Sequence, residues 1–171
     1  MSGAPFHQTA RRNLITISTE PEKPLMRTLF ADTCYWIALL NPRDQLHERA
    51  VRVSQSLIAA QIVTTDEVLT EFLNDFGDRG ILLRQAATRM VAQMQVDSRI
   101  YIEPQSRETF DAGFRFFRAR LDKGYSLTDC ISMDYMLQMQ LTEALTNDEH
   151  FAQEGGLELK SVRSRRAQAR P

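Results

Sequence analysis

The sequence predicts a three-layer α/β/α sandwich built on a central parallel sheet of four to five strands. Short apolar runs alternate with helical patterns from residue 28 to residue 159. This alternation is typical of a parallel sheet that helices cover on both faces. In addition, 43% of the 171 residues are hydrophobic, which is enough to bury the core of one ordinary domain. Disordered and fibrous classes are therefore excluded.

The first half of this region predicts strands that alternate with amphipathic helices. Thr28–Ala31 and residues 62–64 are apolar runs of strand length. The second helix carries Ile58 on its expected buried stripe, and the third follows a cap at Thr65 or Asp66. The helices are expected at about 34–40, 45–60, 66–76 and 81–96.

The second half continues the alternation. Strands are expected at 100–102 and 144–146, with a short fifth strand at 157–159. Ser106 begins one helix, and Ser126 begins another that extends to about residue 140. Apolar residues of the first of these helices recur at spacings of four, three and four, which places them on one face. They are Phe110, Phe114, Phe117 and Leu121.

The two ends of the chain differ from its middle in charge. Residues 1–27, which include three prolines, are expected to form a mobile or loosely docked N-terminal extension. Residues 160–171 are expected to form a basic C-terminal tail. The domain between them, residues 28–159, holds 12 basic and 20 acidic side chains. A nucleic-acid binder usually shows a basic face, so this acidic body suits a protein that concentrates carboxylates around a cation.

Cysteine content and hydropathy exclude further classes of protein. Cys34 and Cys130 are too few for a disulfide scaffold and lack the spacing of a zinc site, so we expect two small, buried, hydrophobic side chains. The sequence shows no apolar run of about 18 residues and no secretory signal. We therefore expect a cytoplasmic protein.

Four acidic residues are expected at one edge of the sheet. Asp32 closes the first strand, and Asp148 follows the fourth. Asp129 lies in the first turn of the helix before the fourth strand. Glu71 lies at the border of the apolar arc on the helix after the second strand, whereas Glu67 falls nearly opposite that arc, so Glu71 is the better candidate and Glu67 is a backup. Because ligands collect at the carboxyl ends of parallel strands, Asp32, Glu71, Asp129 and Asp148 can point into one crevice.

Each acid also has a purely structural explanation, because helix starts favour acidic residues. Ser126 and Asp129, for example, have the spacing of a capping box. However, two carboxylates about 5 Å apart repel by roughly 3 kcal/mol at an effective dielectric constant of 20. Either such groups bind protons or a divalent cation compensates them. Oxygen ligands without clustered Cys or His suit Mg²⁺ or Mn²⁺.

Four segments surround these acids. They are Phe30-Ala31-Asp32-Thr33, Thr64-Thr65-Asp66-Glu67-Val68-Leu69-Thr70-Glu71, Tyr125-Ser126-Leu127-Thr128-Asp129-Cys130 and Ala144-Leu145-Thr146-Asn147-Asp148-Glu149-His150-Phe151. In order and separation they resemble the four motifs of PIN-domain nucleases, most closely those of the VapC-like toxin branch. The resemblance covers about residues 28–159.

The resemblance implies a metal-dependent endoribonuclease that hydrolyses RNA phosphodiester bonds with the help of Mg²⁺ or Mn²⁺. It gives the catalytic and metal-binding roles to Asp32, Glu71, Asp129 and Asp148. Three threonines of the motifs are candidates for orienting these acids, although strand or cap positions would explain them equally well. They are Thr33, Thr128 and Thr146.

The resemblance also implies an RNA substrate, an antitoxin protein that covers the crevice, and a homodimer. Arg115 and Arg118 are candidates for binding RNA phosphates, or they form a solvated helix face. His150 follows Asp148 by two residues, but a histidine before Phe151 more often packs locally. Two other functions stay open: a housekeeping RNA-processing nuclease of the same fold, and a non-catalytic RNA-binding or scaffold domain.

Overall fold

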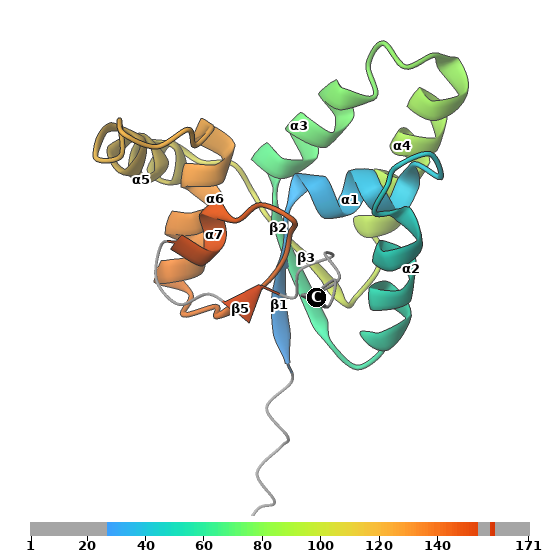
Figure 1. The fold of residues 1–171 in the computed structure, drawn as a ribbon, viewed down its shortest axis with the longest axis horizontal. Helices are drawn as coiled ribbons and strands as arrows, with labels where there is room; N and C mark the ends of the chain where they lie inside the picture. The colour runs from blue at the N-terminus through green and yellow to red at the C-terminus, as the bar shows by residue number, and fades with distance from the viewer. Residues whose placement is uncertain (1–26, 154–157, 160–171) are drawn as a thin grey trace, which may run out of the picture.

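A computed structural model describes residues 27–153 and 158–159 of the chain (Figure 1). At its centre is a five-stranded sheet in the order β3-β2-β1-β4-β5, and every neighbouring pair of strands is parallel. The strands are β1 (Thr28–Ala31), β2 (Gln61–Thr65), β3 (Ile100–Glu103), β4 (Glu143–Leu145) and β5 (Glu158–Leu159). Helices lie on both sides of the sheet, so the predicted α/β/α sandwich is confirmed.

The helices divide into two groups around the sheet. In the described residues they are α1 (Thr33–Leu40), α2 (His47–Ser56), α3 (Asp66–Asp75), α4 (Ile81–Met94), α5 (Arg107–Arg118), α6 (Leu127–Gln138) and α7 (His150–Gln153). In Figure 1, α1, α2 and α4 lie on one side of the sheet, and α5, α6 and α7 lie on the other. α3 contacts α1, α4 and α6. It therefore joins the two groups where the strands end.

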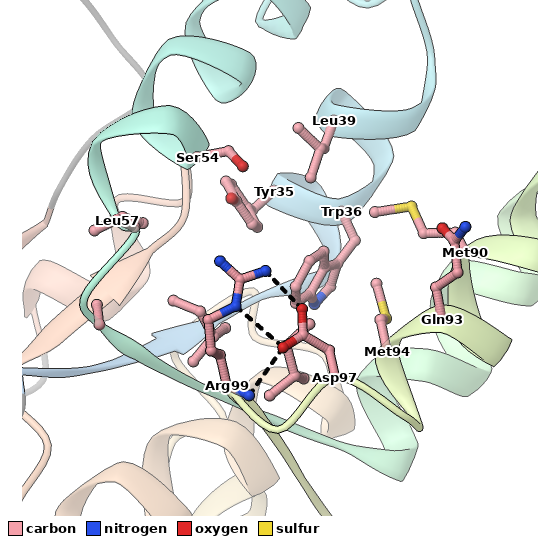
Figure 2. A pocket seen from close by; sticks show the side chains of 13 residues that line it. Tyr35, Trp36, Leu39, Ser54, Leu57, Met90, Gln93, Met94, Asp97 and Arg99 are labelled. Carbon is pink, nitrogen blue, oxygen red and sulfur yellow. Dashed lines mark hydrogen bonds and ion pairs between the residues drawn. The ribbon is translucent and has the colours of Figure 1, made fainter.

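The first group of helices lines an open pocket of about 200 Å³ at the amino ends of β2 and β3 (Figure 2). Trp36, Met90 and Met94 contribute apolar walls. Arg99 also lines this pocket, and its guanidinium group is paired with Asp97 at 2.7 Å. The pocket thus lies at the opposite end of the sheet from the carboxyl ends of the strands.

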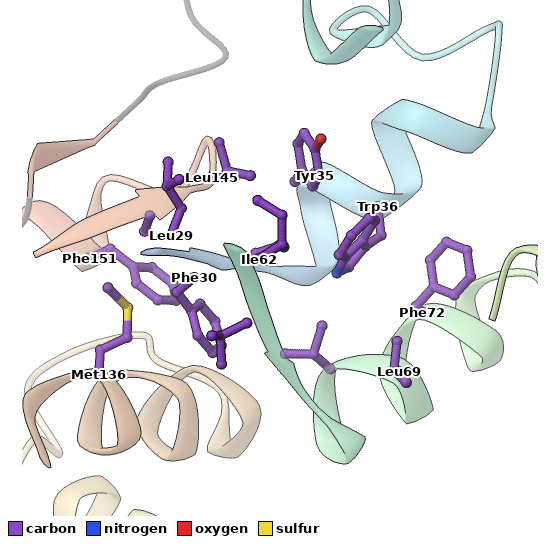
Figure 3. Packing of buried hydrophobic residues seen from close by; sticks show 14 of the residues in the cluster. Leu29, Phe30, Tyr35, Trp36, Ile62, Leu69, Phe72, Met136, Leu145 and Phe151 are labelled. Atoms are coloured by element: carbon purple, nitrogen blue, oxygen red, sulfur yellow. The ribbon is translucent and has the colours of Figure 1, made fainter. Parts of the chain in front are cut away.

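Strand β1 contributes to the core on both faces of the sheet, because successive strand side chains point in opposite directions. Phe30 points toward Met136 and Phe151, whereas Leu29 lies on the side of Tyr35 (Figure 3). The rings of Phe30 and Phe151 are stacked with centroids 6.4 Å apart. Leu29 and Phe30 are both fully buried. The carboxyl end of β1 is consequently held rigidly between two packed layers.

Side-chain caps fix the starts of the helices around that end of the sheet. Thr65 caps α3, because its hydroxyl oxygen accepts a hydrogen bond of 3.3 Å from the Val68 N–H. Ser126 and Asp129 form a reciprocal capping box at the start of α6. Ser106 begins α5 in the same manner. These caps lie where the sequence predicts them.

The second helix is shorter than predicted. α2 ends at Ser56 rather than near residue 60. The chain turns after that residue, so Ile58 leaves the apolar stripe and is 75% exposed. The prediction that Ile58 is buried is therefore wrong.

The aromatic face of α5 is not the face that packs against the domain. Phe114 is 43% exposed and Phe117 is 37% exposed. The buried residues of this helix are instead Ala112 and Gly113. A Cβ atom on Gly113 would lie only 2.2 Å from Cγ1 of Ile131 on α6. Small residues thus let α5 approach α6 closely, which turns the aromatic side chains outward.

Some predictions concern residues beyond the described ranges. The expected N-terminal extension falls there except for Arg27, which forms an ion pair with Glu143. The expected basic tail at 160–171 also falls there. Within the part of the chain that the structure describes, none of the helices has the length and apolar character needed to cross a bilayer.

Candidate metal centre

Two of the four predicted acids lie at the carboxyl ends of neighbouring strands. Asp32 directly follows β1, and Asp148 follows β4. The two strands are paired, and the Asp32 N–H continues their ladder with a hydrogen bond of 3.2 Å to the Leu145 carbonyl oxygen. The register of the sheet therefore brings together two residues that are 116 positions apart in the sequence.

Thr146 links these two acids. Its hydroxyl group donates a hydrogen bond of 2.9 Å to Oδ2 of Asp32. The hydroxyl oxygen of Thr146 in turn accepts a hydrogen bond of 3.0 Å from the Asp148 N–H. Thr146 is fully buried, so its hydroxyl group orients both acid-bearing segments at once.

Glu71 reaches the same region from α3. Its Oε2 accepts a hydrogen bond of 2.6 Å from the hydroxyl group of Thr33. Thr33 begins α1 directly after Asp32. The side chain of Glu71 is therefore tied to the first turn of the helix that Asp32 precedes.

Asp129 has the capping role that the sequence suggests, and it also lies among the acids. Its Oδ2 accepts a hydrogen bond of 2.7 Å from the Ser126 N–H. Ligand atoms of Asp129, Asp148 and His150 lie within 4.8 Å of one another. The carboxyl group of Asp129 also acts electrostatically on Asp32. Capping and metal binding are thus compatible at this residue.

Burial and negative charge together raise the pKa of Asp32 to about 7. Its removal from solvent is the largest cause, since only 4% of the residue is exposed, and the charge of Asp129 is the next. Hydrogen bonds from Thr146, from the Thr33 backbone and from Cys34 lower the pKa in part. The environment of Asp32 therefore disfavours its charged form unless positive charge is added.

The described residues provide no strong basic partner for these acids. Among residues 27–153, no arginine or lysine forms an ion pair with Asp32, Glu71, Asp129 or Asp148. The nearest side-chain partner found there is the imidazole ring of His150, whose Nδ1 lies 3.0 Å from Oδ1 of Asp148. Carboxylate oxygens with one imidazole nitrogen form a donor set that a small divalent cation such as Mn²⁺ or Mg²⁺ can use.

His150 and the backup candidate Glu67 also lie in this region. The His150 ring packs against Tyr125 with centroids 4.8 Å apart, so it packs locally and also contacts Asp148. Glu67 was expected opposite the apolar arc but is only 9% exposed. The position of His150 two residues after Asp148 could have indicated from the sequence that its side chain lies near that acid. The burial of Glu67 depends on contacts with distant segments, which the local sequence does not show.

Cys34 is not the simple buried hydrophobic side chain that we expected. Its thiol group donates a weak hydrogen bond of 3.4 Å to Oδ2 of Asp32, and its sulfur accepts one of 3.1 Å from the Asn147 N–H. Burial and the charge of Asp32 raise the pKa of this thiol to about 12. Cys34 is therefore a neutral group at the edge of the acidic cluster. Cys130 is fully buried, as expected.

The other predicted residues lie around the cluster rather than in it. Thr128 lines a hollow that it shares with Glu71. Arg115 and Arg118 are exposed on α5, where the Arg118 guanidinium group lies 5.9 Å from the Phe114 ring centroid. Arg115 borders a different hollow, which Asp134 also lines. Neither arginine contacts the four acids.

Comparison with known proteins places this geometry in context. The sequence model of the PIN-domain family matches residues 29–156. VapC20 of Mycobacterium tuberculosis, described as a sarcin-ricin loop cleaving toxin, is similar with a TM-score of 0.67 and 23% identity, over 74% of this chain and 95% of that chain. FitAcB of Neisseria gonorrhoeae is similar with a TM-score of 0.55 and 14% identity, over 78% of this chain and 97% of that chain. No curated protein matches the chain at a significant level.

Proposed function

The chain belongs to the PIN-domain family, and on this premise we propose that it is a metal-dependent endoribonuclease that hydrolyses RNA phosphodiester bonds. The observation that carries the proposal is a group of carboxyl groups without an arginine or lysine partner among residues 27–153. Ligand atoms of Asp129 and Asp148 lie within 4.8 Å of one another together with His150, and Thr146 links Asp148 to Asp32. Thr33 ties Glu71 to the helix that follows Asp32. A fold gains no stability from such a group of charges by itself. A bound divalent cation would offset the repulsion between these carboxylates.

We assign the metal-binding role to Asp32, Glu71, Asp129 and Asp148. When bound, Mg²⁺ or Mn²⁺ would polarise the scissile phosphate and lower the pKa of a water molecule. One of the carboxylates accepts the proton that the attacking water releases. Because Asp32 is buried while the other three are half-buried, the substrate approaches from the side of Glu71, Asp129 and Asp148.

Three threonines and one histidine orient these acids in our proposal. Thr33 and Thr146 donate hydrogen bonds to carboxylate oxygens, which fixes the direction of those groups. Thr128 precedes Asp129 and borders the same hollow as Glu71. His150 holds Asp148 through its Nδ1. Such partners matter because a misdirected carboxylate lowers both metal affinity and turnover.

We further propose that the nuclease is the toxin of a toxin–antitoxin pair. The fold likeness to VapC20, which is described as a toxin, supports this choice over a housekeeping RNA-processing enzyme. In this proposal an antitoxin protein covers the crevice, and the toxin is a cytoplasmic homodimer. Expression of the chain alone should then arrest growth, and the D32N variant should not. Normal growth would favour the housekeeping enzyme.

An RNA cleavage assay tests the enzymatic proposal. Purified protein is incubated with a mixed single-stranded RNA in Mn²⁺, in Mg²⁺ and in excess EDTA. We expect products with either metal and none with EDTA, and we expect D32N to be inactive while it stays folded. A non-catalytic RNA-binding or scaffold domain would retain RNA without metal-dependent products.

A further inference from the structure

A hollow of about 380 Å³ lies between α3 and the α5–α6 side of the domain. We call it the α3–α6 hollow. Its lining includes Glu67, Thr70, Glu71 and Asn74 of α3, Phe110 of α5 and Thr128 of α6. Because Glu71 belongs to this lining and Thr128 precedes Asp129, the hollow adjoins the proposed metal centre.

Polar side chains form one wall of this hollow. They recur on α3 at positions i, i+3, i+4 and i+7, which places them on one stripe of the helix. The stripe consists of Glu67, Thr70, Glu71 and Asn74. The remaining lining mixes apolar and polar side chains. Phe110 is half-buried there, and its ring stacks on Phe114 and lies 5.3 Å from the Arg107 guanidinium group. A few convergent polar groups beside apolar surface are typical of ligand sites.

Glu67 is the exceptional member of the stripe. It is only 9% exposed, and its Oε1 is buried without a hydrogen-bond partner. Among the described residues, its carboxyl group forms neither an ion pair nor a hydrogen bond. By contrast, the neighbouring Glu71 accepts a hydrogen bond from Thr33. A buried acceptor without a donor is costly, which indicates that a ligand supplies the donors.

We propose that the α3–α6 hollow binds an unpaired guanine base beside the scissile phosphate, with Glu67 as the residue that reads it. The inference rests on the proposed function, because it names a subsite for the RNA of that reaction. An ionised carboxylate only accepts hydrogen bonds and can accept two in parallel. Guanine offers two adjacent donors, N1–H and N2–H, on its Watson–Crick edge.

The competing role for Glu67 is that of another metal ligand. Its place one helical turn before Glu71 makes both roles geometrically accessible. The two roles predict different losses on substitution. If Glu67 reads the base, its substitution should remove the preference between oligonucleotides even without metal. If Glu67 is a metal ligand, its substitution should lower the affinity for Mn²⁺.

Binding in EDTA tests the proposal without relying on cleavage. The probes are two fluorescent ten-nucleotide uridine tracts that carry one central guanosine or one central inosine, which lacks the N2 amino group. Fluorescence anisotropy gives both affinities for the wild type, for Glu67→Gln and for Glu48→Gln. Glu48 is an exposed control on α2, with its side chain 87% exposed.

We expect the wild type to bind the guanosine probe about tenfold more tightly than the inosine probe, the size of one good base contact. Glu67→Gln should lose or reverse the preference, because its amide nitrogen is a donor that faces the N2 amino donor, which the inosine probe lacks. Glu48→Gln should keep the preference. Equal binding of both probes by the wild type, which needs no variant, would overturn the proposal, and so would a preference that survives in Glu67→Gln.

A Mn²⁺ titration separates the two roles of Glu67. The titration, followed by electron paramagnetic resonance of free Mn²⁺, should give the same affinity for wild type and Glu67→Gln. A tenfold loss would make Glu67 a metal ligand and overturn the assignment. Failure of metal-dependent cleavage would instead contradict the proposed function, and the anisotropy data in EDTA distinguish these failures.

Discussion

The hydroxyl group of Thr146 donates a hydrogen bond of 2.9 Å to Oδ2 of Asp32. Both groups are buried, and they come from the ends of the neighbouring strands β4 and β1. The contact exists because the parallel register aligns Ala31 with Leu145. The direction of the Asp32 carboxylate is therefore set by the sheet itself.

Thr146→Val keeps the shape of the side chain but removes its hydroxyl group. The variant should lower Mn²⁺-dependent cleavage by about 10- to 100-fold, the usual cost of losing a partner that orients a metal ligand. It should also lower the free energy of unfolding by about 1–3 kcal/mol, since the Asp148 N–H loses its acceptor. Cleavage rates and urea denaturation measure the two effects. The exposed Thr142→Val is the matched control, and equal effects of both variants would contradict this role.

Asp32→Asn should change the pH dependence of stability in EDTA. The pKa of Asp32 is raised from 3.8 to about 7 in the folded protein. A carboxyl group of this kind favours the folded state at low pH, and that contribution is lost as the pH rises through the folded pKa. The unfolding free energy of the wild type should therefore fall between about pH 4 and pH 8, by up to about 4 kcal/mol.

The Asn side chain cannot ionise, so D32N should flatten this fall and be the more stable protein at pH 8. Urea denaturation at a series of pH values provides the measurement. Asp122→Asn, at an exposed position, is the control. Parallel pH profiles for D32N and the wild type would refute the raised pKa.

Gly113→Ala should destabilise the domain. The added Cβ atom would lie 2.2 Å from Cγ1 of Ile131, so α5 or α6 must shift. Overpacking of this kind costs about 1–3 kcal/mol. Gly124→Ala has no heavy atom within 4 Å of the new Cβ and should be neutral or slightly stabilising. Thermal denaturation compares the two, and an equal melting temperature would argue against close packing of α5 on α6.

Charge reversal on α5 tests the proposed contact with RNA phosphates. Arg115→Glu combined with Arg118→Glu should weaken RNA binding and flatten its dependence on salt, because fewer counterions are then released. Affinity for a single-stranded RNA is measured at several salt concentrations. Arg89→Glu on α4 is a control at another exposed arginine. Unchanged affinity would show that α5 does not contact RNA.

The sequence was sufficient to predict the sheet and the places of Asp32, Asp129 and Asp148 at the ends of its elements, because these depend on local patterns. The metal-binding role of the four acids stays a prediction. Asp32 and Asp148 follow apolar strands, and strand ends in a parallel sheet meet at one edge. Ser126 and Asp129 mark a helix start by their spacing alone. At these positions the elements predicted from local sequence patterns are the ones that the fold contains, which is why the predicted fold class is confirmed.

The positions that escaped prediction depend on distant contacts. Glu67 is buried at a hollow whose other wall comes from α5 and α6, about 40 to 60 residues later. Phe114 is exposed because Gly113 brings the opposite side of α5 against α6. Cys34 joins the acidic cluster because β4 delivers Thr146 and Asn147 beside it. The spacing of apolar residues along a helix does not show which distant segments these side chains contact.

Isothermal titration calorimetry with Mn²⁺ at pH 7.5 measures whether Asp32, Glu71, Asp129 and Asp148 form one cation site. The wild type should bind Mn²⁺, and single amide substitutions of Asp32, Glu71, Asp129 and Asp148 should each weaken binding at least about tenfold. Asp134→Asn, a half-buried acid outside the cluster, should bind as the wild type does. Absence of Mn²⁺ binding by the wild type, or full binding by any of the four variants, would show that the four acids do not form one cation site.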